Sequence, residues 1–189
     1  CYHGGKSRIE ADELQEDARR DKWCATLAMA MGRSLNVVFG RLAQKNLTPD
    51  DVTAMGGAFG FGAPIPFAVQ NEAPQIDIPV DPLEFARASA GFWHTTLSPL
   101  AAALIAQTVA NRGVALEPRI VEAVYKENEK IWSETRGPAT LRRAVKPETA
   151  AELTAMMTET VANGSAYKSF HDKRGKAYLP DIVVAGKTG

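Results

Sequence analysis

The sequence predicts a mainly α-helical fold with a small β component. Apolar residues recur at helical spacing in several segments, and most of these segments begin at a capping residue or a proline. The stretches that resemble strands are few, short and apolar. The chain has 189 residues, of which 45% are hydrophobic and 23% charged, and this is the composition of an ordinary globular domain. We therefore expect residues 1–189 to fold rather than to remain disordered.

The charge balance argues against a nucleic-acid partner, and the apolar runs are too short to span a membrane. Lys and Arg together number 22, as do Asp and Glu, so no long-range field favours nucleic acid, and we expect no nucleic-acid partner. No apolar run approaches the length of about 20 residues that spans a bilayer. Residue 1 is a Cys in a polar stretch, which differs from a signal peptide. The sequence therefore looks excised from a longer protein.

The two cysteines, Cys1 and Cys24, have neither metal-ligand nor redox-motif spacing, so we expect no metal and no cofactor. A disulfide between them would require an oxidising compartment. Burial of Cys24 as a free core residue is the other interpretation. The sequence leaves both open.

The first helix is expected after a polar segment, residues 4–21, which reads as a solvated loop or a short exposed helix. From Lys22 onwards, apolar residues recur at four-residue spacing: Trp23, Leu27 and Met31. This helix leads to Ser34 and Asn36, and the helical period restarts at Val38. The Ser-Leu-Asn tripeptide therefore lies at a junction between two helices, where its side chains can face a cleft.

The next helix is expected to start at Thr48, because a Thr cap, a proline in the first turn and two carboxylates favour helix nucleation. We expect it to end by Gly56-Gly57. The following Phe59-Gly60-Phe61-Gly62 predicts a tightly turning loop anchored by two aromatic rings. A phosphate-binding loop is the alternative, but no strand precedes it and no helix follows it. Prolines keep residues 63–82 extended.

Three further helices and a hairpin complete the prediction. Asp81-Pro82 opens a short helix to about Ser89, and Ser98-Pro99 caps a longer one that ends at residues 111–113. Lys146-Pro147 begins the last helix, which ends at Asn163-Gly164. The hairpin is expected from residues 118–125 and 129–133 around a turn at 126–128. Between these elements, His94 is weighed as a general base, but no Ser or Cys arrangement accompanies it, so we expect it at a cleft rim or in solvent.

The motifs with the clearest chemistry lie far apart in the sequence. Near the start stands Ser34-Leu35-Asn36, and at the end a short buried strand, Ile182–Gly186, runs into Lys187-Thr188-Gly189. Together they resemble the second and third motifs of the penicillin-recognising serine acyltransferases. Four longer stretches resemble the transpeptidase domain of penicillin-binding proteins in order and spacing: Trp23–Ala30, Phe59–Gly62, residues 96–113 and residues 160–166.

This resemblance implies a role for each motif residue. Ser34 would relay protons between the catalytic lysine of the family and the leaving amine, and Lys187 would place a positive charge near it. Asn36 would hold the substrate amide. Thr188 would hydrogen-bond the substrate carboxylate, and Gly189 would let the substrate lie close to the strand. The implied fold is the helical half of an α/β (β-lactamase/transpeptidase-like) domain plus the Lys-Thr-Gly strand.

The first family motif, Ser-any-any-Lys, does not precede Ser34 in this sequence. The single match is Ser165-Ala166-Tyr167-Lys168, which follows the second motif, and we interpret it as unrelated because its use would break the family order. We therefore expect residues 1–189 to be a partial transpeptidase domain that lacks the nucleophile motif and the last sheet strands. By itself such a chain is expected to be inactive.

The function implied is that of a peptidoglycan DD-transpeptidase, which cross-links stem peptides through an acyl-serine and binds β-lactams, at the extracytoplasmic face of the bacterial inner membrane. A non-catalytic β-lactam or muropeptide sensor is the alternative, and a serine β-lactamase is a third. Because the Ile182 to Lys187 strand would lack its neighbours, we also expect that the chain either self-associates through it or leaves this segment disordered.

Overall fold

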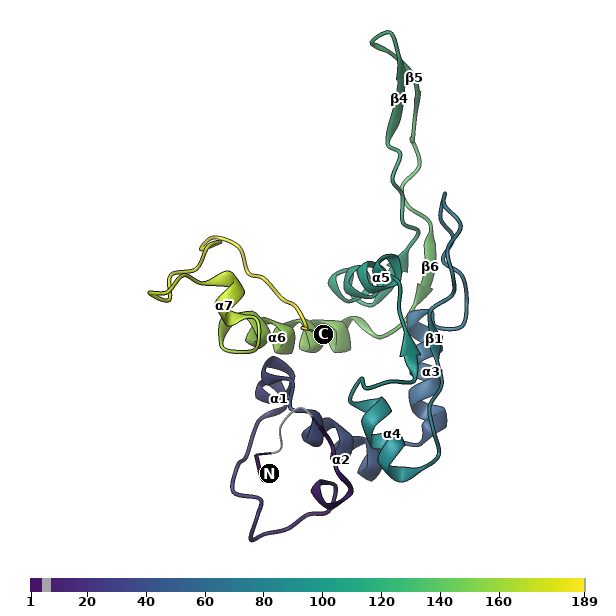
Figure 1. Cartoon of the computed structure of the whole chain (residues 1–189). Helices are drawn as coiled ribbons and strands as arrows, with labels where there is room; N and C mark the ends of the chain where they lie inside the picture. Colours follow the sequence, from purple (N-terminus) through teal and green to yellow (C-terminus); the bar gives the residue numbers. More distant parts are fainter. Residues whose placement is uncertain (5–7, 189) are drawn as a thin grey trace.

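The computed structural model describes residues 1–4 and 8–188, and helices form most of its regular structure (Figure 1). The helices are α1 (Leu27–Arg33), α2 (Asn36–Asn46), α3 (Pro49–Phe59), α4 (Pro82–Ser89), α5 (Pro99–Ala110), α6 (Pro147–Ala162) and α7 (Tyr167–Phe170), with a short 3-10 helix at Ala11–Glu13. The mainly α prediction is confirmed. Within this described part, no helix is both long and apolar enough to cross a membrane.

The strands pair in antiparallel two-stranded sheets. They are β1 (Gln75–Ile76) with β2 (Thr95–Thr96), β3 (Val114–Leu116) with β6 (Thr140–Arg143), and β4 (Ala123–Lys126) with β5 (Glu129–Ser133). A small apolar core joins α5 to the β3–β6 sheet, and its buried members are Ile65, Ala101, Leu104 and Ala115. The apolar side of α5 therefore faces the protein, as its sequence period predicts.

Helix α1 packs against α6 at very short range. Gly32 is buried on α1, and a Cβ atom built at this glycine would lie only 2.9 Å from the Glu159 Cβ of α6. Beyond the end of α6, the Ser165 N–H donates to the Gly32 carbonyl at 2.9 Å. A Cβ at Gly164 would also collide with that carbonyl. Glycines on both sides of the contact thus allow the two backbones to touch.

The first helix begins later than the sequence period predicts. Thr26 caps α1 by accepting a hydrogen bond from the Met29 N–H at 3.1 Å, so the helix starts at Leu27 and not near Lys22. The Trp23 backbone instead pairs with Tyr2, with N···O distances of 2.7 and 3.0 Å. The apolar spacing was misleading because Trp23 is exposed and extended.

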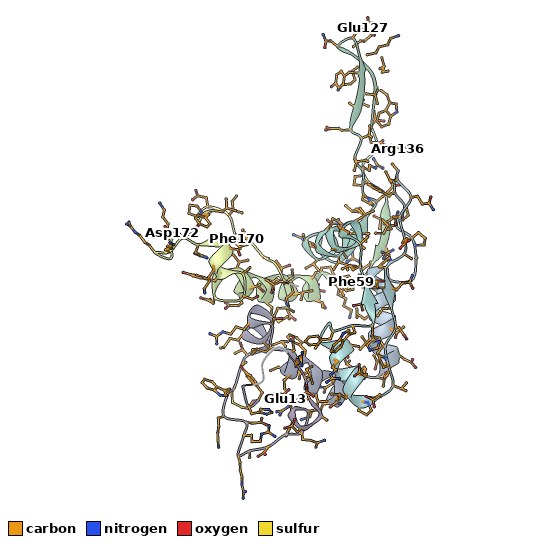
Figure 2. The ribbon with its side chains drawn as sticks, viewed as in Figure 1. Glu13, Phe59, Glu127, Arg136, Phe170 and Asp172 are labelled. Atoms are coloured by element: carbon orange, nitrogen blue, oxygen red, sulfur yellow. A yellow bond between two sulfur atoms is a disulfide. The ribbon has the colours of Figure 1, made fainter. Side chains whose placement is uncertain are left out.

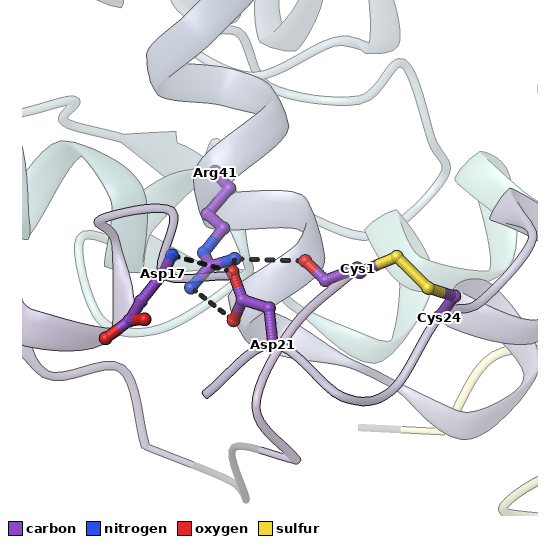
Figure 3. Close-up of a disulfide and its surroundings, with 5 residues drawn as sticks. All are labelled: Cys1, Asp17, Asp21, Cys24 and Arg41. Carbon is purple, nitrogen blue, oxygen red and sulfur yellow. Dashed lines mark hydrogen bonds and ion pairs between the residues drawn. A yellow bond between two sulfur atoms is a disulfide. The ribbon is translucent and has the colours of Figure 1, made fainter. Parts of the chain in front are cut away.

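The N-terminal segment is attached more firmly than a solvated loop. Cys1 and Cys24 form a disulfide, which resolves the two open interpretations in favour of the bridge (Figure 3). The Arg41 guanidinium of α2 donates to the Glu13 carbonyl at 2.6 Å and to the Asp21 carboxylate at 2.8 Å. The hydrogen bond from Arg41 holds the pKa of Asp21 down at about 2. Ile9 is buried, with 1% exposure.

Two turns follow the sequence prediction only in part. Helix α3 continues through Gly56-Gly57 and ends at Phe59, because Gly60 at φ 103° supplies the left-handed cap. The Phe59-Gly60-Phe61-Gly62 loop does turn tightly. The predicted hairpin is confirmed, although β4 begins at Ala123 rather than at residue 118. Figure 2 shows the hairpin projecting from the body, with Glu127 at its tip and Arg136 at its base.

The predicted terminal strand is wrong. Residues 182–188 form no strand, and the Ile182 and Val183 side chains are 60% and 86% exposed. The segment is tied to α6 by one backbone hydrogen bond, from the Gly186 N–H to the Met157 carbonyl at 3.2 Å. In the described part of the chain every strand is already paired elsewhere. A strand needs a neighbour for its backbone groups, and this segment has none.

We expect the α1–α6 contact to tolerate no side chain at Gly32. The variant Gly32→Ala should lower the free energy of unfolding by about 1–3 kcal/mol, since the new methyl group overpacks the contact. Gly57→Ala is the matched control: it lies in α3 with no atom within 4 Å of its Cβ position, and should stabilise by up to about 1 kcal/mol. Urea unfolding measures both. A Gly32→Ala variant as stable as the parent chain would contradict the close packing.

We expect the exposed end of the chain to cause self-association. Ile182 and Val183 present exposed apolar side chains on a segment that pairs with no strand of the described chain, so a second chain could pair with it. Light scattering after size exclusion, at tens of micromolar, should give a mass above that of the monomer, and Val183→Asp should reduce it. A monomeric parent chain would contradict this expectation.

Candidate functional site

Ser34 occupies the sharp turn between α1 and α2. Its backbone is left-handed, at φ 54° and ψ 53°, and its N–H closes the end of α1 on the Met31 carbonyl at 3.1 Å. This conformation is uncommon for a residue with a side chain and costs about 1–2 kcal/mol. Asn36 is the first residue of α2. Ser34 and Asn36 therefore lie at the junction of two helices, as the sequence predicts.

Lys187 meets Ser34 from the other end of the chain. Its Nζ donates to the Ser34 Oγ at 2.9 Å, across 153 positions of sequence, and also to the Thr188 carbonyl at 2.7 Å. Desolvation lowers the pKa of Lys187 from its ordinary value, although part of the side chain remains exposed. The structure thus places the cation of one motif directly on the hydroxyl of the other.

The hydroxyls of Thr188 and Ser165 extend the cluster. The Thr188 Oγ1 and the Ser165 Oγ lie 2.7 Å apart, in hydrogen-bond contact. The sequence motifs do not predict this role, because Ser165-Ala166-Tyr167-Lys168 is an out-of-order match and the resemblance of residues 160–166 to the family assigns Ser165 no partner. The signal that could have found it is the resemblance of Gly164-Ser165-Ala166 to the Gly-Thr-Ala of the family, with Ser in place of Thr.

Three further residues were considered for the site from the sequence: Asn36, Gly189 and His94. Asn36 lies two residues after Ser34, at the start of α2 and partly buried. Gly189 lies outside the described residues. His94 contacts Glu84 of α4, with 3.2 Å between its Nε2 and the carboxylate oxygen. Hydrogen bonds from Arg87 and then His94 lower the pKa of Glu84. This contact gives His94 a structural partner on α4.

The cluster has the chemistry of proton transfer and anion binding. An ammonium on a hydroxyl can deliver a proton through that hydroxyl, and a neighbouring threonine can donate to a carboxylate. Within residues 1–4 and 8–188, no three His, Cys, Asp or Glu side chains are gathered to hold a metal ion.

Comparison with known proteins identifies the family. The model of the penicillin binding protein transpeptidase domain matches residues 2–189. The chain belongs to this transpeptidase family. A relative named peptidoglycan D,D-transpeptidase PbpA, from Mycolicibacterium smegmatis, is 32% identical over 165 residues, which are 87% of this chain and 31% of the relative. The chain thus spans about a third of the length of that transpeptidase.

Two solved structures resemble the fold of this chain. The D,D-transpeptidase domain of a peptidoglycan glycosyltransferase from Eggerthella lenta is 28% identical, with a TM-score of 0.72 over 89% of this chain and 42% of that one. Penicillin-binding protein A of Mycobacterium tuberculosis, solved as a ceftriaxone acyl-enzyme complex, is 28% identical, with a TM-score of 0.71 over 87% of this chain and 35% of that one. These likenesses support the α/β transpeptidase fold that the sequence predicts.

We expect Lys187 to titrate below its ordinary pKa of 10.5. Burial disfavours the ammonium, so the unfolded chain binds a proton more tightly than the folded chain does. Stability should therefore rise as the pH increases from the folded pKa towards 10.5. Titration of the Lys187 Cε signal by NMR measures the shift, with the denatured chain as control. Equal midpoints in the two states would contradict the desolvation.

Proposed function

We propose that this chain supplies the proton-relay and substrate-recognition groups of a peptidoglycan DD-transpeptidase. The observation that carries the proposal is the 2.9 Å hydrogen bond from the Lys187 Nζ to the Ser34 Oγ. It joins the two motifs that the sequence resemblance singled out. The family membership and the D,D-transpeptidase names of the relatives support the same reaction class.

In this proposal Ser34 relays protons and Lys187 places a positive charge beside it. The Lys187 ammonium donates to the Ser34 oxygen, which leaves the Ser34 hydroxyl proton free to point at the leaving amine. As the C–N bond of the substrate breaks, the leaving nitrogen takes the proton of Ser34, and the oxygen of Ser34 takes a proton from the lysine of the Ser-any-any-Lys segment. The Lys187 charge stabilises the negative charge that develops on the Ser34 oxygen during these transfers.

The other motif residues would hold the substrate. Asn36 would bind its amide, and Thr188 would donate a hydrogen bond to the terminal carboxylate of a D-Ala-D-Ala stem peptide. Gly189 would leave room for the peptide backbone. We assign the attacking serine to a Ser-any-any-Lys segment outside these residues. The expected ligands are peptidoglycan stem peptides and β-lactams, and the expected location is the extracytoplasmic face of the inner membrane.

The 189-residue chain should form no covalent adduct with a labelled penicillin, because no Ser-any-any-Lys precedes Ser34 to attack the lactam. Intact mass after incubation measures this. A stoichiometric adduct that maps to Ser165 would overturn the assignment of the nucleophile.

A chimera tests the proposed reaction itself. Residues 1–189 should replace the corresponding segment of the M. smegmatis relative, with its remaining residues kept. The chimera should be acylated by fluorescent penicillin and should cross-link a stem peptide. Ser34→Ala and Lys187→Ala should each lower the acylation rate by about 10²-fold or more, the size typical of a lost acid–base group for Ser34 and of lost electrostatic stabilisation for Lys187. Ser169→Ala, an exposed serine on α7, is the control.

The outcomes separate the three candidate functions. Slow release of the acyl group with transfer to an amine supports the transpeptidase. Stable acylation without any cross-linking would favour the sensor, and rapid hydrolysis of penicillin would favour the β-lactamase. Full activity of both variants would overturn the relay.

A further inference from the structure

Ser165 lies between the two motif segments and contacts both. Its backbone N–H donates to the carbonyl of Gly32, two residues before Ser34, at 2.9 Å. Its side-chain Oγ lies 2.7 Å from the Thr188 Oγ1. One residue in the loop after α6 therefore connects the turn that carries Ser34 to the segment that carries Thr188.

The position of Ser165 is fixed by backbone geometry. The preceding Gly164 has no room for a Cβ, because that atom would collide with the Gly32 carbonyl. The next residue, Ala166, donates from its N–H to the buried Thr160 carbonyl at 3.0 Å. With both neighbours held, the Ser165 hydroxyl is presented at a defined place beside Thr188.

We propose that Ser165 is a positioning residue that orients the Thr188 hydroxyl towards a bound carboxylate. A hydroxyl has one proton, so Thr188 can donate to an anion only if it does not spend that proton on Ser165. When Ser165 donates, Thr188 accepts, and the Thr188 proton points outward. The two consecutive hydrogen bonds, from Ser165 to Thr188 and from Thr188 to the carboxylate, then have aligned dipoles, and this alignment strengthens each of them. The nearby Lys187 cation favours the same anion.

This inference rests on the proposed function, since it concerns the carboxylate that Thr188 is proposed to bind. It predicts that Ser165 affects the preference for a carboxylate ligand and not merely the stability of the fold. Ser165→Ala should weaken binding of a peptide with a free carboxylate, while the same peptide with a terminal amide should be unaffected. Ser165→Thr keeps the hydroxyl and should restore the preference for the carboxylate.

The test is an NMR titration of the 189-residue chain with an acetylated Lys-D-Ala-D-Ala peptide and with its C-terminal amide. The parent chain should bind the acid more tightly than the amide. In Ser165→Ala the affinity for the acid should fall by about two- to tenfold, because the neutral Ser165–Thr188 hydrogen bond that orients the Thr188 hydroxyl is lost. Ser165→Thr and the control Ser169→Ala should behave like the parent chain, and the amide spectra of α1 report that each variant is folded.

Each other result overturns a different statement. If Ser165→Ala retains the full preference for the acid, the inference about Ser165 fails and the proposed function stands. If it weakens both peptides equally, Ser165 is only structural. If the parent chain shows no preference for the acid, or binds neither peptide, the proposed role of Thr188 fails and the inference fails with it.

Discussion

The contact between α1 and α6 is the constraint on which the rest of the site depends. Ser34 stands two residues after Gly32, and Ser165 follows the end of α6, so the distance between the two helices sets the distance between their side chains. A contact made by backbone and not by long side chains leaves little freedom of adjustment. The relative placement of the two hydroxyls is thus determined by glycines that take no part in the chemistry.

The N-terminal segment also supports the turn between α1 and α2 that carries Ser34. The disulfide holds Cys24 against Cys1, two residues before the Thr26 cap of α1, and Arg41 ties the segment to α2. Figure 3 shows these bonds gathered within one small region. Both helices that flank Ser34 are therefore anchored to residues 1–24. A polar sequence can be structurally important when its carbonyls and carboxylates satisfy a single arginine.

Local signals in the sequence were sufficient to predict where most helices start. Thr48, Ser98 and Asp81 each cap a helix through side-chain hydrogen bonds to backbone N–H groups, and such bonds depend only on residues two or three positions away. Their starts were predicted correctly for that reason.

The sequence-based predictions of secondary structure failed where pairing between distant residues determines the structure. Trp23 pairs with Tyr2, and residues 182–188 lack a neighbouring strand, and neither fact is encoded in the local pattern. The Ser34 and Lys187 motifs could be recognised as a family pattern. The contact of Ser165 with Thr188 was not predicted, because the family resemblance of residues 160–166 marks the segment and not its partner, and the contact depends on how the loop after α6 folds back onto α1.

The left-handed backbone of Ser34 has an evolutionary consequence. Glycine would adopt φ 54° without steric penalty, so selection for stability alone would drive this position towards glycine. Such a drift would remove the hydroxyl that Lys187 contacts. Under the proposed relay, activity and fold stability oppose each other at this position, and laboratory evolution of heat-resistant variants without selection for activity should lose the serine early.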